Sequence, residues 1–413
     1  MSMPSSHFFL KRMKSILILL LCLSSASALT LPLGDIAKRV RTHHPALKAA
    51  RLAIEEARGR HLGAGRLANP TVGYDFQNQS NVSPQTGVFS IDQSFPLTRR
   101  LSLEKKHTAQ LVEAAELEVR DVERKLIAEA RAHAVRLLTL SRQRELRRQQ
   151  TELAQKLADF AQGRAKAGEV SPLDAKQVQL DSQRLRIESR LLEAESVTLL
   201  GQLKPMLGLR SEDSLVISGE WPSLALPGAA AWQKRPDYRL AQTKVAAAQT
   251  AQDLAKAKRI PDVSAGFFAS REMQDVTPVN RERTGFLGFR ISIPLPFWNR
   301  NQGEIAEKTA AAERARLESE ALALQINSEA GTARQEMETN ASIVRETRDS
   351  LLPLAMQQTA EMQKAYEAGQ ADLLSVLRAR EQRLQLESAA LNAERDFHLA
   401  RIRYEAATGA YLP

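Results

Sequence analysis

The sequence predicts a mainly α-helical chain that also supplies four β-strands to a transmembrane β-barrel, closed only when several copies assemble. One observation behind this fold class is a duplication: His44-Pro45 recurs as Arg235-Pro236 191 residues later, and Ala167-Gly168 recurs as Ala368-Gly369 201 residues later. The others are a long run of helix-forming residues in each copy and, before it, two segments of alternating polarity. A repeat of this length indicates one duplicated supersecondary unit.

The first 28 residues have the features of a secretory signal. Three basic residues precede an apolar run at 16–23, and small residues ending at Ala28 form a cleavage site. Cys22, the only cysteine, lies inside this segment and follows Leu21 rather than a small residue, so we expect no lipid anchor. We expect cleavage after Ala28 and a mature chain without disulfides, as suits an exported bacterial protein.

The charge of the chain does not indicate nucleic acid as a partner. Loss of the three basic signal residues lowers the formal charge from +10 to +7. The remaining basic residues alternate with acids, as in the segment Arg120 to Lys125, instead of forming a block. This pattern is typical of a solvated helix surface.

The first structural repeat, residues 29–220, begins with a short helix and two expected strands, at about 71–79 and 86–96. In the first strand Val72, Tyr74 and Phe76 alternate with polar residues such as Asp75. A helical hairpin is expected at about 101–208, because residues 97–162 contain no proline or glycine. Its apolar residues form a narrow coiled-coil seam, and its first helix would be roughly 100 Å long at ~1.5 Å per residue.

The second structural repeat, residues 221–413, has the same order. Strands are expected at about 261–270 and 284–295, and a helical hairpin at about 303–408. Gly331 and Pro353 should bend its long helix, since proline lacks an amide donor. Because neither half can bury its strands or its helical seam alone, we interpret the two repeats as one intertwined domain.

Alternating segments of about ten residues are typical of outer-membrane strands, although soluble half-buried strands alternate in the same way. Four strands cannot close a barrel, since an open edge in lipid leaves unpaired backbone groups. The chain must therefore oligomerise, and two copies would give eight strands where three would give twelve.

Particular residues carry a resemblance to a known family. The duplicated order of helix, strand pair, long helix and returning helix resembles the TolC-like outer-membrane efflux family. Residues 291–305 (ISIPLPFWNRNQGEI) look most like its CzcC-like heavy-metal branch, the outer-membrane components of cobalt-zinc-cadmium efflux systems, and the turn at 365–369 (AYEAG) is similar to the family's. The resemblance implies a homotrimer in the outer membrane lipid, extending into the periplasm and docking to a periplasmic adaptor and an inner-membrane RND-type pump.

The hairpin ends are the first candidate sites. The resemblance implies a periplasmic gate at Asp174, although Asp174 also suits the first turn of a helix capped by Ser171. Asp372 is the acid of the second repeat, and Arg378 could pair with acids across the mouth, with surface solvation as its alternative role. Matching acids in both repeats are in doubt, because Ser375 stands where Asp174 stands in the first repeat. Candidate adaptor-docking residues at the same ends are Gly168, Val170, Ser171, Gly369 and Leu373, with helix capping as the alternative role of the glycines.

The strands supply the remaining candidates. Asp75, Asp92 and Arg290 are expected to line the pore, since charge on the lipid face is costly. Phe297 and Trp298 are expected at the membrane interface, with burial under the adjoining helix as the alternative. The histidine spacing indicates no metal site, and the GAGRLA segment at 63–68 lies in the wrong order for a dinucleotide site.

We therefore expect a passive exit duct, not an enzyme, without cofactor or resident metal. The expected cargo is heavy-metal cations, with drugs or other small organic molecules as the alternative. A periplasmic coiled-coil adaptor or scaffold is the competing class, but an adaptor would carry one hairpin and a compact β-domain.

Overall fold

The computed structural model describes residues 29–78, 85–228, 232–277 and 280–410. The expected signal peptide and the last residue of the expected strand 71–79 lie outside these ranges. The chain forms two compact units, and both take segments from both repeats. Unit 1 comprises residues 1–45, 125–228 and 333–403; unit 2 comprises 46–124, 229–332 and 404–413. The boundary between the repeats therefore does not separate the units.

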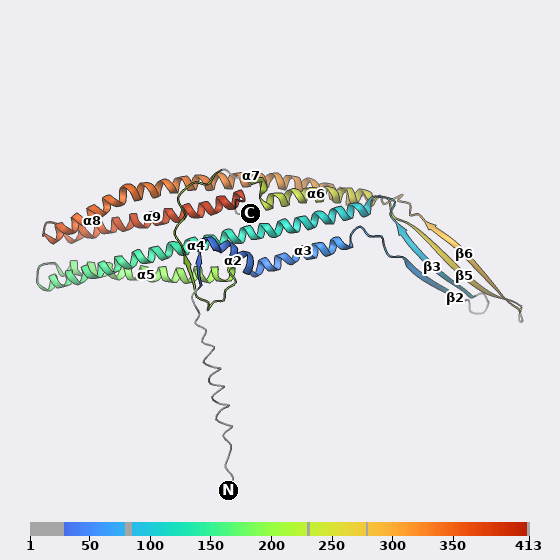
Figure 1. Ribbon diagram of the computed structural model, residues 1–413, viewed down its shortest axis with the longest axis horizontal. Helices are drawn as coiled ribbons and strands as arrows, with labels where there is room; N and C mark the ends of the chain where they lie inside the picture. Colours follow the sequence, from blue (N-terminus) through green and yellow to red (C-terminus); the bar gives the residue numbers. More distant parts are fainter. Residues whose placement is uncertain (1–28, 79–84, 229–231, 278–279, 411–413) are drawn as a thin grey trace, which may run out of the picture. The chain divides into compact units, whose positions relative to one another are not determined.

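Unit 1 is built largely from two helical hairpins (Figure 1). One joins the second part of α4 (Arg100–Lys166) to α5 (Pro172–Met206), and the other joins α8 (Leu352–Glu367) to α9 (Leu373–Thr408). α4 runs 67 residues without a break, because this stretch lacks proline and its few β-branched residues are outnumbered by strong helix formers.

The second hairpin is interrupted where the sequence predicts a perturbation. α7 (Gln302–Glu346) gives way to a π-helical turn, η3 (Thr347–Leu351), directly before Pro353 in α8. Proline cannot donate to the carbonyl four residues back, and a π turn accommodates the missing bond. Gly331, by contrast, lies inside α7 without a break in the helix.

The core of unit 1 includes a small sheet that the sequence analysis missed. β1 (Leu29–Pro32) pairs in parallel with β4 (Leu215–Ser218). Leu31 and Leu215 pack in a buried cluster with side chains from α2 (Ile36–His43), α4 and α5. Four-residue strands carry too little alternation to be recognised, so only long-range pairing reveals them.

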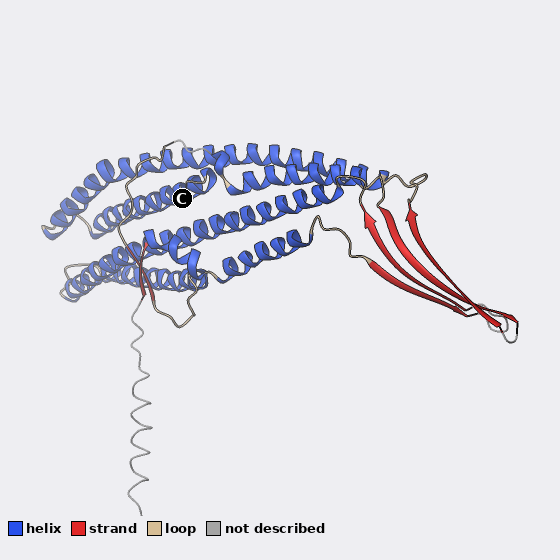
Figure 2. Cartoon of the chain, turned by 45° about the vertical axis from the view of Figure 1, so that its right-hand side comes forward, coloured by secondary structure: helices blue, strands red, loops and turns tan. Residues whose placement is uncertain are grey.

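Unit 2 contains α3 (Pro45–Gly63), α6 (Pro236–Ala257), the first parts of α4 and α7, and a four-stranded sheet. The strands are β2 (Thr71–Asn78), β3 (Gln85–Phe95), β5 (Val263–Thr277) and β6 (Asn280–Ser292). Their order is β2-β3-β5-β6, all antiparallel (Figure 2). The predicted fold class is confirmed in its long helices and its four strands; closure of a barrel by three chains stays a prediction.

The second strand pair differs in its bounds from the expected 261–270 and 284–295. β5 continues to Thr277, because backbone pairing with β6 outlasts the apolar alternation on which the expectation depended. β6 ends at Ser292, two residues before Pro294, which has no amide to donate. Among the described residues, no helix is long and apolar enough to cross a membrane.

Candidate functional site

The strand register places the three predicted pore residues on one face of the sheet. Asp92 lies opposite Gly266, and Gly266 lies opposite Arg290, so Asp92 and Arg290 belong to the same cross-strand row. Asp75 pairs with Val88, four residues before Asp92 on the same strand, and so belongs to the same face. This polar face also holds rows rich in serine and threonine, such as Ser94, Ser264 and Ser292.

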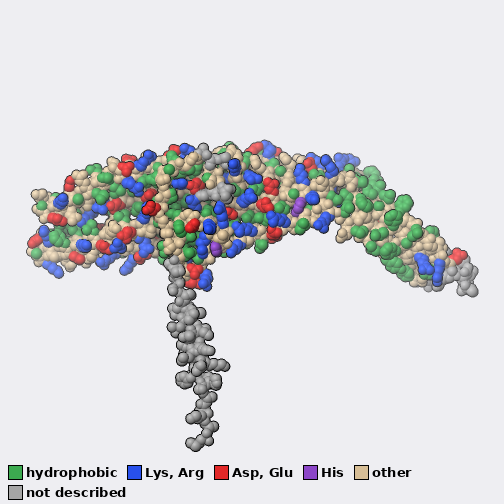
Figure 3. Space-filling view, viewed as in Figure 1, with side chains coloured by type: hydrophobic (Ala, Val, Ile, Leu, Met, Phe, Trp, Pro, Cys, Tyr) green, Lys and Arg blue, Asp and Glu red, His purple; other side chains and the backbone are tan. Residues whose placement is uncertain are grey.

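The opposite face is apolar and uncovered. Two rows cross all four strands, Tyr74, Phe89, Ala269 and Leu287, and then Val72, Ile91, Phe267 and Phe289. Leu287 is 89% exposed and Phe289 is 73% exposed. Figure 3 shows the resulting hydrophobic surface over the sheet. A contiguous apolar surface of this kind marks contact with lipid or with another protein.

Both outer edges of the sheet are open within the described part of the chain. β2 pairs only with β3, and β6 pairs only with β5. An edge strand presents a row of unpaired amide and carbonyl groups and is a template for a further strand. The sheet is therefore incomplete as one copy.

The loop after β6 exposes Phe297 and Trp298, which are 64% and 89% exposed and meet edge to face at 6.0 Å between ring centroids. The alternative of burial under the adjoining helix is not what the structure shows. Asn301 fixes the loop: its backbone has a positive φ of 60°, and its side-chain amide donates to the Ala255 carbonyl at 2.9 Å and to Glu304 at 2.7 Å. The two rings thus project from an anchored turn.

The two hairpin ends share one capping geometry. Gly168 donates to Ala165 and Glu169 donates to Arg164; in the second repeat Gly369 and Gln370 bond Tyr366 and Ala365 in the same pattern. These paired bonds are a Schellman motif, which requires a left-handed residue at the glycine position. The φ angles of 78° at Gly168 and 73° at Gly369 explain the glycines.

The following helices begin with side-chain caps. The Ser171 hydroxyl accepts from the Leu173 amide at 3.2 Å, and Asp174 lies exposed in the first turn of α5. Asp372 accepts from the Ser375 amide at 2.8 Å. The hydrogen bonds from Ser375, aided by the positive charge of Arg378, hold the pKa of Asp372 below its ordinary value. Arg378 itself is exposed.

One predicted docking residue is buried. Leu373 is 5% exposed and packs with Tyr366, Val178 and Val376 in a cluster near the hairpin ends, which corrects its assignment as a surface contact. Val170 is half-buried. Leu173, at the end of the first hairpin, is by contrast 75% exposed. The sequence alone does not distinguish Leu173 from Leu373, because the exposure of a leucine after a turn depends on packing.

A cavity of about 340 Å³ lies between the hairpins of unit 1 and is lined partly by charged residues, among them Arg378, Asp181 and Arg380. Burial raises the pKa of Asp181. Burial, with the nearby charge of Arg383, lowers the pKa of Arg380. Of the candidate gate residues, Arg378 lines this cavity, and Asp174 and Asp372 are not among its lining residues.

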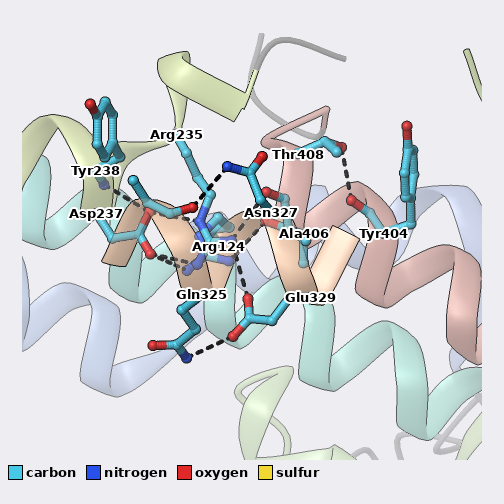
Figure 4. A network of polar contacts seen from close by, with 12 residues as sticks. Arg124, Arg235, Asp237, Tyr238, Gln325, Asn327, Glu329, Tyr404, Ala406 and Thr408 are labelled. Carbon is cyan, nitrogen blue, oxygen red and sulfur yellow. Dashed lines mark hydrogen bonds and ion pairs between the residues drawn. The ribbon is translucent and has the colours of Figure 1, made fainter. Parts of the chain in front are cut away.

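Unit 2 holds a buried ionic network that the sequence analysis missed (Figure 4). Asp237 accepts from Arg235 at 2.6 and 2.7 Å and from Arg124 at 3.3 Å. Arg124 also bonds Asp121 at 2.6 Å and the Ala406 carbonyl at 2.9 Å. Arg235 also donates hydrogen bonds to Glu329 at 3.3 Å and to the Ala407 carbonyl at 3.1 Å.

The network joins the start of α6 and the end of α9 to the interior of α4 and α7. Burial by itself would raise the pKa of Asp237, but the Arg235 hydrogen bonds and the Arg124 charge hold it below its ordinary value. The arginines are only 6% and 5% exposed. A buried network of this kind, with its charges paired, fixes the relative positions of the helices that it joins. In the described ranges, no group of three or more His, Cys, Asp or Glu side chains could hold a metal ion.

Part of the chain resembles a known protein family, and most of the chain has the fold of solved structures. Residues 229–410 match the family described as OEP, Outer membrane efflux protein. The chain has the fold of VceC, an outer membrane protein of Vibrio cholerae, with a TM-score of 0.74 and 17% identity, covering 91% of this chain and 96% of that one. The match to CusC has a TM-score of 0.74 and 15% sequence identity, and it covers 91% of this chain and 91% of that one.

The Campylobacter jejuni CmeC outer membrane channel gives a TM-score of 0.74 at 13% identity, covering 91% of this chain and 85% of that one. No curated protein sequence matches the chain significantly. The matching family and channels are non-enzymatic transport ducts, which agrees with the prediction that the chain is not an enzyme. Residues 229–410 are thus similar to the outer membrane efflux protein family, and the chain as a whole has the fold of these solved outer-membrane channels.

Proposed function

We propose that the chain is the outer-membrane component of a tripartite efflux system, a passive exit duct that spans the outer membrane and extends into the periplasm. The observation that carries this proposal is the two-faced sheet, with exposed apolar rows on one side and Asp75, Asp92 and Arg290 on the other. An apolar outside and a polar inside are what a water-filled barrel in lipid requires.

The open edges of β2 and β6 support assembly with further copies, since every backbone group must be paired in lipid. Three copies would give twelve strands, the number that the family resemblance implies. The hairpin ends, with Gly168, Val170, Ser171 and Gly369, are the proposed contact with a periplasmic adaptor, which in turn would couple the duct to an RND-type pump. Phe297 and Trp298 would lie at the membrane interface.

We propose heavy-metal cations as the cargo, on the resemblance of residues 291–305 to the cobalt-zinc-cadmium branch. Export of drugs or other organic molecules is the second candidate. Deletion of the gene should lower tolerance to zinc, cobalt or cadmium, and restoration of the gene should recover it. Sensitivity restricted to organic toxicants would refute the metal assignment while leaving the duct intact.

The face assignment has a sharp test. Phe289→Arg places a charge on the apolar face and should cost about 2–4 kcal/mol if this face meets the bilayer core. Thr284→Arg places the same charge on the polar face, where it should be tolerated. We expect outer-membrane fractionation and heat-modifiable migration to be lost for Phe289→Arg alone. Equal behaviour of the two variants, or a wholly soluble periplasmic wild-type chain, would refute the proposal.

A further inference from the structure

The four connections between helices and strands in unit 2 lie at one end of the sheet. Phe95 at the end of β3 pairs with Val263 at the start of β5, and Ser292 at the end of β6 pairs with Ser264. Thr71 at the start of β2 pairs with Asp92 near the end of β3. The starts of β2 and β5 and the ends of β3 and β6 therefore share one end, as Figure 2 shows.

Each of these four connections carries an exposed arginine. We call the following residues the junction arginines: Arg66, Arg99, Arg259 and Arg300. They come from connections far apart in sequence, so only the sheet register brings them to the same level of unit 2. Figure 3 shows basic side chains where the helices meet the hydrophobic surface of the sheet.

The junction arginines differ from neighbouring basic residues in having no carboxylate partner within the described part of the chain. Arg100, one residue after Arg99, pairs with Glu104 at 2.8 Å and with Asp262 at 2.6 Å. Lys258, next to Arg259, pairs with Glu304 at 3.2 Å. The local acids are thus occupied by other cations, and the junction arginines remain available to an anion from outside.

The described side chains at the opposite end of the sheet include both basic and acidic residues in equal number. Among its described side chains, Arg271 and Arg283 are balanced by Glu272 and Glu282. Among the described side chains, basic residues without an acidic neighbour therefore lie at the helical end, next to the exposed apolar rows and to Trp298. This is the level at which a bilayer presents phosphate groups, and an arginine can keep its aliphatic stem on the apolar surface while its guanidinium reaches that layer.

We propose that the junction arginines bind the phosphate groups of the glycerophospholipid leaflet that faces the helices, and so fix the depth at which the sheet sits in the membrane. The inference rests on the proposed function, because it requires the apolar face to meet lipid. A planar guanidinium donates two parallel hydrogen bonds to a phosphate, which favours arginine over lysine at these positions.

The test uses mature protein purified in mild detergent and native mass spectrometry with added phosphatidylglycerol. The four junction arginines are replaced together by glutamine. The matched control removes four exposed cations that also have no described ion pair but lie on α4 and α5: Lys156, Lys166, Lys176 and Arg190, each replaced by glutamine. Each cation near an anionic lipid surface contributes on the order of fivefold in binding.

We expect the junction variant to bind phosphatidylglycerol at least about tenfold more weakly, the control variant to bind as wild type does, and four Arg→Lys changes to restore much of the loss. Binding of diacylglycerol, which lacks the phosphate, should be the same for all variants. Circular dichroism checks that the helices of every variant are intact.

Unchanged phosphatidylglycerol binding by the junction variant, or equal losses in junction and control variants, would overturn the inference. Equal binding of free inorganic phosphate at the same concentration would also overturn the inference, because the ligand would then be a soluble anion. Fractionation of wild type separates the two proposals. A soluble wild type defeats the channel function and this inference together, whereas an outer-membrane wild type with indifferent arginines defeats the inference alone.

Discussion

Replacement of Asp237 by asparagine should destabilise unit 2 strongly, although the two side chains have nearly the same volume. The side chain accepts three hydrogen bonds from Arg235 and Arg124 and one from the Tyr238 amide at 2.9 Å. An asparagine side chain would keep the volume but would remove the carboxylate that both buried arginines share. Breaking a buried ion pair by neutralising one partner costs about 3–5 kcal/mol.

The lower end of that range applies, because each arginine retains other partners. Arg124 keeps Asp121 and the Ala406 carbonyl, and Arg235 keeps Glu329 and the Ala407 carbonyl. We therefore expect a loss of about 3 kcal/mol, which for a chain of this size lowers Tm by about 3–4 °C, at an unfolding entropy of ~2.1 cal/mol/K per residue. The assay is thermal loss of helical circular dichroism of the purified protein in detergent at neutral pH.

The pH dependence checks the cause. Because the pKa of Asp237 is lower in the folded chain than in the unfolded chain, its contribution is present above the ordinary carboxyl pKa and is lost as pH falls through the folded value. The difference in Tm between wild type and Asp237→Asn should therefore shrink in acid. Glu313→Gln, which removes the exposed pair with Arg316, is the control and should leave Tm unchanged. A change in Tm below about 2 °C for Asp237→Asn, or one equal to the control, would refute the assignment.

Other predictions follow from single sites. Gly369→Ala should destabilise the hairpin end by about 1 kcal/mol, since φ is 73° there. Gly163→Ala, inside α4, should be neutral or stabilising. Hydrogen exchange at the hairpin ends distinguishes the two variants, and equal protection of the amides in both would contradict the capping role. Burial, with the charges of Arg401 and Arg142, lowers the pKa of His398 to about 4, so wild type should lose on the order of 3 kcal/mol as pH falls from about 6.5 to 4. Thermal melts of His398→Gln should show no such loss. Leu203→Ala, at a fully buried position, should cost about 2–5 kcal/mol in a denaturant titration, and a loss below about 1 kcal/mol would mean that the site collapses around the cavity.

Much of the candidate site followed from local patterns. The side-chain period of two put Asp75, Asp92 and Arg290 each opposite the apolar residues of its own strand, and the cost of a charge facing lipid predicted one shared polar face. The strand register places all three on one face. The turn residues of the hairpins were equally legible, because a left-handed backbone position selects glycine. Leu373 was the exception. Its burial depends on Tyr366 and Val178, and the sequence around a single apolar residue after a turn does not predict which distant residues pack against it.

The sequence by itself determined the period of each element, the sites where helices stop and the polarity of the two sheet faces. These are properties of a few consecutive residues and of their backbone preferences. Only the tertiary structure decided which distant segments meet. Examples are Arg124 with Asp237, separated by 113 residues, the parallel pairing of β1 with β4, and the four junction arginines at one end of the sheet. Such meetings depend on loop closure and packing over the whole chain, and no local pattern encodes them.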